Sequence, residues 1–127
     1  MVDYDGQDNL KTYLDGLAWT ALTKPTFYFD YERSNNIYKN VLVIEEFGIT
    51  PQRLNYDQYI LNHHLRIRQV YDTKAQLYPH FWYLLKNLWK LADADTNYTL
   101  GEVETSYMAK KKEVFIFIDW QEIRSLA

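Results

Sequence analysis

The 127-residue sequence contains no cysteine, which excludes disulfide bonds, thiolate metal ligands and cysteine nucleophiles. It also has no excess of positive charge. The 14 basic and 17 acidic residues give a formal net charge of -3, whereas proteins that bind nucleic acids are usually basic. No apolar run is long enough to cross a bilayer. The N-terminal sequence Met-Val-Asp-Tyr-Asp is too acidic and polar for a signal peptide. These absences predict a soluble protein of the intracellular type.

The composition that remains is typical of one globular domain. Apolar residues make up 47% and charged residues 24%, which places the chain outside the disordered class. No repeat, linker or low-complexity segment divides the sequence, so we expect a single domain over residues 1–127. Aromatic residues reach 17%, with 12 Tyr, 6 Phe and 4 Trp, and this surplus over ordinary usage needs a physical explanation.

Two segments have the periodicity of helices. Over residues 8–22 apolar side chains recur at intervals of three and four, and Pro25 is expected to end this helix because the residue before a proline avoids helical geometry. Residues 75–92 are expected to form a second helix, whose apolar stripe is widened by Tyr78, Trp82 and Trp89. Pro79 suits the first turn of a helix, so a start at Tyr78 is the alternative.

The first half of the chain also contains strand patterns. Residues 26–31 are expected to form a short strand or an extended arm, and residues 41–46 a strand rich in β-branched side chains. Residues 47–57 include Gly48 and Pro51, which predict a long loop.

Residues 58–71 alternate between apolar and polar side chains, which predicts a strand with one core face and one basic, polar face. This strand is longer than usual, so part of it is expected to project beyond the domain or to bend. Residues 98–109 and 113–120 then predict a hairpin whose last strand is apolar on both faces and therefore covered on both sides. The expected order is α-β-β-α-β-β, which predicts an α+β, two-layer domain with both helices on one face of an antiparallel sheet.

The sequence carries no recognisable catalytic constellation. There is no Ser-His-Asp or Cys-His arrangement, and neighbours on a strand such as His63 and His64 point to opposite faces. We expect His63 to be a satisfied core residue and His64 to lie on the surface. Glu45 and Glu46 also straddle a strand, which argues against paired acid–base chemistry. We therefore expect a protein that is not an enzyme and that needs no cofactor.

The segment after the second helix partly matches a calcium-binding loop. Asp93, Asp95, Asn97 and Glu104 occupy positions 1, 3, 5 and 12 of such a loop. However, the sixth position, where the turn requires glycine, is Tyr98. We therefore favour a polar connection between helix and strand, and a calcium site remains an alternative.

A run of basic residues marks the expected hairpin tip, formed by Lys110, Lys111 and Lys112. Such a run can contact phosphate or an acidic partner. A solvated tip that protects a strand end from aggregation is the more common role, and we favour it here.

A second basic group shares one face of the long strand, formed by His64, Arg66 and Arg68. Contact with phosphate is one interpretation. The other is pairing across a subunit boundary with carboxylates of a neighbouring copy, and this interpretation needs no basic net charge. The candidate carboxylates are Glu45, Glu46, Glu102 and Glu104.

The aromatic surplus indicates a protein that binds a partner or further copies of itself. A domain with two helices and four strands has little room for so many aromatic rings, given that Phe115 and Phe117 fall on the outer face of an already apolar strand. Aromatic residues are enriched at interfaces. A coding bias toward Tyr and Asn is the alternative explanation. We expect self-association or a standing partner.

The order of elements resembles that of the tail terminator, or tail-completion and head–tail joining, proteins of long-tailed bacteriophages. In that family an initial helix is followed by an apolar strand like Val41–Ile44, a variable loop and a long alternating strand like Tyr59–Tyr71. A helix and a closing hairpin like Phe115–Trp120 complete the pattern. The resemblance covers nearly the whole chain, but the aromatic-rich segment 26–38 departs from it.

The resemblance implies a structural virion protein that is made in the host cytoplasm and located at the head-proximal end of the tail. It implies a homo-hexameric ring that caps the tail tube and joins it to the head connector. DNA would pass through this ring without sequence-specific binding. The projecting half of the long strand and the hairpin at 102–118 would form the ring interface, and the segment 47–57 would face the tube or connector.

A second interpretation is a ferredoxin-like binding module, because the order of elements is a circular permutation of βαββαβ. Such a module would bind a protein or stack single-stranded nucleic acid on Phe115, Phe117 and Tyr107.

Overall fold

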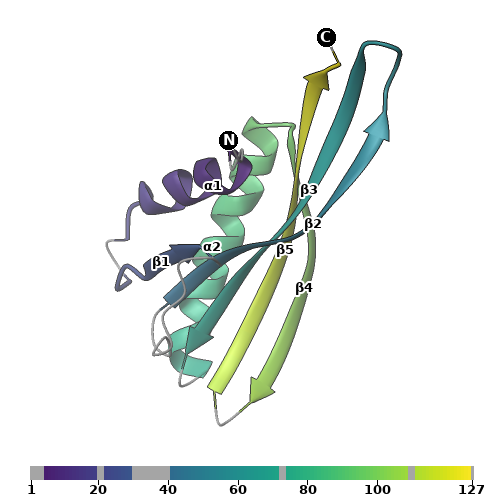
Figure 1. Cartoon of the computed structure of the whole chain (residues 1–127). Coiled ribbons are helices and arrows are strands. Elements are labelled where there is room, and N and C mark those ends of the chain that lie inside the picture. The colour runs from purple at the N-terminus through teal and green to yellow at the C-terminus, as the bar shows by residue number, and fades with distance from the viewer. Residues whose placement is uncertain (1–4, 20–21, 30–40, 72–73, 109–110, 127) are drawn as a thin grey trace.

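The computed structural model describes residues 5–19, 22–29, 41–71, 74–108 and 111–126. They form two helices and five strands (Figure 1). In chain order these are α1 (Asp5–Asp15), β1 (Thr26–Phe29), β2 (Val41–Arg53), β3 (Gln58–Tyr71), α2 (Lys74–Ala94), β4 (Tyr98–Met108) and β5 (Lys111–Ser125).

The strands form one sheet in the order β1-β2-β3-β5-β4. The α+β class is confirmed, but the sheet has five strands and is mixed, not a four-stranded antiparallel sheet. The additional strand is β1, which pairs in parallel with Val41–Ile44 of β2. A parallel neighbour requires a long connection, and residues 30–40 separate the two strands in the chain.

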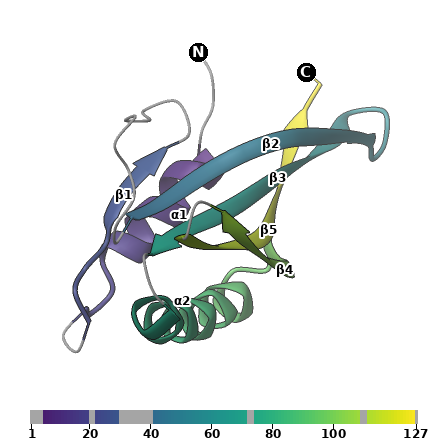
Figure 2. The same cartoon turned by 90° about the horizontal axis from the view of Figure 1, so that it is seen from below.

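Both helices contribute to one hydrophobic core with the sheet. Figure 2 shows the twisted sheet with α2 lying beneath it. Leu10 and Leu14 of α1 and Leu84 and Leu88 of α2 are fully buried in the same cluster as alternate residues of β2, β3 and β5. The strand contribution consists of Leu42, Ile44, Leu65, Ile67, Val114, Ile116 and Ile118.

Helix α1 begins earlier and ends much earlier than the periodicity predicts. It stops at Asp15, and the amides of Gly16 and Leu17 bond back to the carbonyls of Thr12 and Leu14 at 3.1 and 3.3 Å. The indole Nε1 of Trp19 donates a further bond to the Leu14 carbonyl at 3.1 Å. These bonds satisfy carbonyls that the end of a helix leaves open.

Helix α2 spans Lys74–Ala94, which confirms the helix predicted over residues 75–92, and the alternative start at Tyr78 is wrong. Pro79 lies inside the helix, where it removes one backbone hydrogen bond. Leu77 is fully buried in the core. Burial of Leu77 offsets the missing bond.

The predicted loop at 47–57 is also wrong for most of its length, because β2 continues to Arg53 before a short turn. The strand accommodates Gly48 at a bulge and Pro51 on its outer edge. Within the described residues β1 covers only Val41–Ile44, so no further strand needs the amide that Pro51 lacks. The turn is closed by the amide of Asn55, which donates to the Gln58 carbonyl at 3.2 Å.

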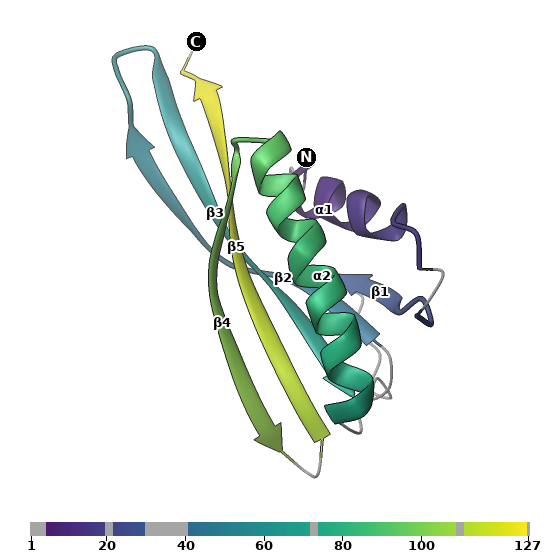
Figure 3. The ribbon, with the colours of Figure 1, turned by 180° about the vertical axis from the view of Figure 1, so that it is seen from behind.

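Strands β2, β3 and β5 run past the helices and form a three-stranded projection (Figures 1 and 3). We call residues 47–62 and 121–126 the extension. In the extension β2 pairs with β3 from Thr50 opposite Asn62 to Arg53 opposite Tyr59. Strand β3 pairs with β5 from Asn62 opposite Gln121 to Gln58 opposite Ser125. The expectation that part of the long strand projects is therefore confirmed. Among the described residues, no helix is both long and apolar enough to cross a membrane.

Candidate functional site

The sheet face opposite the helices is partly exposed, and we call it the open face. Along β5 the residues at even positions from Val114 to Trp120 are buried, whereas Phe115 and Phe117 are only partly covered. The last strand is thus apolar on both faces, as predicted, but the second face lacks full cover within this chain. The open face comprises Glu45 and Phe47 of β2, His64, Arg66 and Arg68 of β3, and Glu113, Phe115, Phe117 and Asp119 of β5.

Arg66 lies at the centre of the open face. Its Nε and Nη2 atoms donate to one carboxylate oxygen of Glu45 at 3.0 and 2.8 Å. The guanidinium carbon also lies 5.0 Å from the ring centre of Phe115 and 5.8 Å from that of Phe47. Phe47 in turn meets Phe117 edge-on at 5.6 Å. Aromatic rings and one paired arginine therefore form a continuous, half-exposed surface.

The other two basic side chains of this face also have carboxylate partners. Arg68 Nη2 lies 2.6 Å from Glu113 Oε1, and His64 Nδ1 lies 3.0 Å from Asp119 Oδ1. The expected pairing of His64, Arg66 and Arg68 with carboxylates of a neighbouring copy is therefore not needed, because each has a partner in its own chain. Strand pairing is the reason, since Glu45 lies directly opposite Arg66.

The described residues of the lysine run, Lys111 and Lys112, lie at the opposite end of the sheet from the extension (Figure 1). Lys111 and Lys112 begin β5, opposite Met108 and Tyr107 of β4. Lys110 lies outside the described residues. The predicted hairpin is present, but Lys111 and Lys112 are paired residues of its second strand, β5, and do not form a turn.

The calcium-loop residues are not gathered into a site. The carboxylate of Asp95 accepts a bond from the Asn97 amide at 3.0 Å in a tight turn, and Tyr98 is buried at the start of β4. Glu104 lies farther along β4, opposite Phe115 on the open face. Within the described ranges no three histidine or carboxylate side chains form a group suited to a metal ion. Asp93 lies within the last turn of α2.

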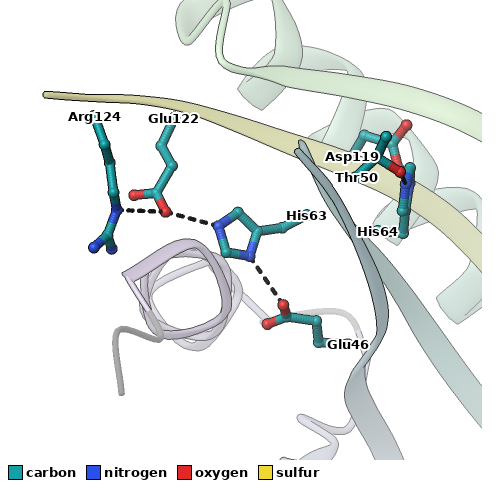
Figure 4. A network of polar contacts seen from close by, with 7 residues as sticks. All are labelled: Glu46, Thr50, His63, His64, Asp119, Glu122 and Arg124. Atoms are coloured by element: carbon teal, nitrogen blue, oxygen red, sulfur yellow. Dashed lines mark hydrogen bonds and ion pairs between the residues drawn. The ribbon is translucent and has the colours of Figure 1, made fainter. Parts of the chain in front are cut away.

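His63 lies on the helix side of the sheet and is 5% exposed, which confirms the prediction of a satisfied core residue. Its two ring nitrogens contact Glu46 at 2.9 Å and Glu122 at 2.8 Å (Figure 4). Arg124 donates to the same Glu122 oxygen at 3.0 Å. The sequence analysis missed Glu122 and Arg124. The only available signal was that a buried histidine on the core face requires polar partners.

The pKa of His63 reflects two opposing effects. Burial of the imidazole lowers its pKa, but the hydrogen bonds to Glu46 and Glu122, together with the charges of these carboxylates, raise it more strongly. The net result is a pKa above the ordinary value of 6.5. The positively charged form of His63 is thus favoured in the folded chain.

Helix α2 exposes aromatic side chains that the sequence analysis assigned to a widened core stripe. Trp82 is 61% exposed and Trp89 is 54% exposed, with Tyr78 on the same side of the helix. Because α1 and the sheet already cover the opposite side of α2, these rings contact solvent. They form a second apolar surface, separate from the open face.

Comparison with known proteins adds no assignment. No protein-family model matches the chain, and no curated protein matches it. The function is therefore argued from the surfaces described above.

Proposed function

We propose that this protein is a self-associating structural subunit of the phage tail terminator type, which forms a ring at the head-proximal end of a tail. The order of its elements supports this proposal. A first helix, an apolar strand, a long strand, a second helix and a closing hairpin occur in the order that the resemblance uses. The differences are the short parallel strand β1 and the paired strand in place of the variable loop.

The observation that carries the proposal is the exposed apolar surface of the extension. Ten large hydrophobic side chains are exposed among the described residues, and six of them lie in the extension. An extension that served only to stabilise the monomer would have its apolar side chains buried against a core. The six are Phe47, Ile49, Leu54, Tyr56, Ile123 and Leu126.

The distribution of these residues favours more than one contact. Leu54 and Tyr56 lie in the turn at the tip, and Tyr56 is 91% exposed. Phe47 belongs to the open face, beside Phe117. In the proposed ring, the open face and the sides of the extension contact neighbouring copies, and the tip contacts the tail tube or the head connector. Such a head-to-tail contact between unlike surfaces closes a ring, which the resemblance makes a hexamer.

The charge pattern of the open face supports a role that does not involve tight binding of DNA. Arg66 and Arg68 each have a carboxylate partner, so their charge is largely compensated within the chain. Each uncompensated cation that meets a phosphate adds salt-dependent affinity, and that affinity would slow the passage of DNA through a ring.

Electron microscopy of purified variants tests where the ring interface lies. The double variant Phe47→Ser/Ile123→Ser removes two exposed side chains of the extension. Trp82→Ser is the matched control because Trp82 is equally exposed but lies on α2. We expect annular particles for the wild type and the control, and folded monomers, with unchanged circular dichroism, for the double variant. Rings that survive the double variant would contradict the proposed interface.

A second candidate function is the stacking of single-stranded nucleic acid on the open face, and the contact of the partly buried Phe115 ring with the Arg66 guanidinium favours it. Fluorescence anisotropy with a labelled single-stranded oligonucleotide at 50 and 200 mM salt tests it. We expect no measurable binding at micromolar protein, because the cations are paired. Binding that weakens steeply with salt and is lost in Phe115→Ser would instead support this candidate.

A further inference from the structure

His63 occupies the root of the extension, where β2, β3 and β5 leave the core. Its ring centre lies 5.1 Å from that of Trp120, which is itself buried. The indole of Trp120 packs closely against α1, because a Cβ added to Gly6 would lie only 2.4 Å from its Cε3 atom. The imidazole is therefore held between three strands and next to the packed start of a helix (Figure 4).

The polar contacts of His63 tie these strands together. Nδ1 contacts Glu46 of β2, and Nε2 contacts Glu122 of β5, both within 2.9 Å. A carboxylate accepts hydrogen bonds and does not donate them. Only an imidazole that carries a proton on both nitrogens satisfies both contacts, whereas the neutral ring would turn a lone pair toward one carboxylate.

We propose that His63 is a proton-dependent link between β2 and β5. The charged imidazole keeps the root of the extension rigid, and loss of its proton makes the root more flexible. The device lies outside the ring-forming surfaces and does not rest on the proposed function. Its effect is to set how rigid the extension is relative to the core of the sheet.

The surrounding charges agree with this assignment. Glu46 comes from β2, while Glu122 and Arg124 come from β5, and the side chains of both carboxylates are less than one-fifth exposed. Arg124 shares Glu122 and so compensates part of its charge. Glu46 and Arg124 also have interactions beyond this network. From α1, Gly6 packs against the indole of Trp120, and neither residue carries a charge. His64 and Asp119 lie on the opposite face of the sheet.

The sign of the pH dependence follows from the raised pKa of His63. A histidine whose pKa is higher in the folded state stabilises that state fully below its unfolded pKa. This stabilisation is lost as the pH rises through the folded pKa. The root of the extension is therefore rigid in mildly acidic solution and becomes more flexible as the pH rises through the raised pKa of His63.

The test combines a ring-proton NMR titration of His63 with amide hydrogen exchange between pH 5.5 and 8.5, corrected for the intrinsic rate. We expect protection at residues 49–53, 58–62 and 121–124 to fall about tenfold as His63 titrates, while the core strands at 65–67 and 116–118 keep theirs. The variant His63→Gln is expected to remove the pH dependence, and His64→Gln, the matched control, to retain it.

A second variant keeps the test decisive if His63→Gln fails to fold. Glu46→Gln removes one carboxylate but keeps a hydrogen-bonding side chain, so it is expected to lower the His63 pKa and to move the loss of protection to lower pH by the same amount. Protection that stays constant through the His63 titration would overturn the proposal, as would a protection midpoint that does not follow the pKa in Glu46→Gln.

Discussion

Individual side chains on the strands face the directions that alternation predicts. His63 and Glu46 point to the helix side, while His64 and Glu45 point to the open face. Their partners were harder to predict. Glu122 is 59 residues away from His63 in sequence, and only the pairing of β3 with β5 brings the two together. A side chain's face follows from local periodicity, but its partner follows from strand order.

Two buried glutamines give a test at this scale. Gln7 donates to the Ile44 carbonyl at 2.9 Å and thereby ties α1 to β2. Gln69 is fully buried on the core face of β3, and among the described residues neither atom of its amide has a hydrogen-bond partner. An unpaired buried polar group costs about 1 to 3 kcal/mol.

We therefore expect Gln69→Met to raise the free energy of unfolding by about 1 to 3 kcal/mol, because the new side chain has similar volume and no polar group to satisfy. The matched variant Gln7→Met is expected to lower it by a similar amount, since it removes the hydrogen bond between α1 and β2. Urea denaturation measures both. A destabilised Gln69→Met would show that this amide has a partner in solution.

Individual elements were predicted with uneven success, and the errors have one physical cause. Gly48 and Pro51 are signals for a loop, and Pro79 is a signal for a helix start, when only local preference is considered. In the structure β2 pairs with β3 up to Arg53, and α2 gains buried contacts before Pro79. Tertiary pairing and burial outweigh these local preferences, which reach about 3 kcal/mol for a proline inside a helix.

The two sides of α2 provide a test at the scale of an element. Leu84 is fully buried, so Leu84→Ala is expected to lower the free energy of unfolding by about 2 to 5 kcal/mol. Trp82→Ala removes more atoms than Leu84→Ala. It is nevertheless expected to lower the free energy of unfolding by about 1 kcal/mol or less, because most of the indole is in solvent. Urea denaturation of both variants compares them. A larger loss for Trp82→Ala would mean that this face of α2 is covered.

At the scale of the whole molecule, the α+β class and the projection of the long strand were predictable, but the sheet order was not. Periodicity reports which residues share a face, and it carries no information on which strands are neighbours. The short strand β1 was recognised as extended, but its parallel pairing with β2 depends on a return of the chain that no local pattern specifies. The mixed character of the sheet follows from that pairing.

The central claim is that the exposed apolar surface of the extension and open face exists to bind further copies of this chain. Sedimentation equilibrium of the wild-type protein, from about 1 to several hundred micromolar, tests it most directly. The account predicts a transition from monomer to one closed oligomer of defined mass, because a head-to-tail ring stops growing when it closes. A protein that remains monomeric across the whole range would contradict the account.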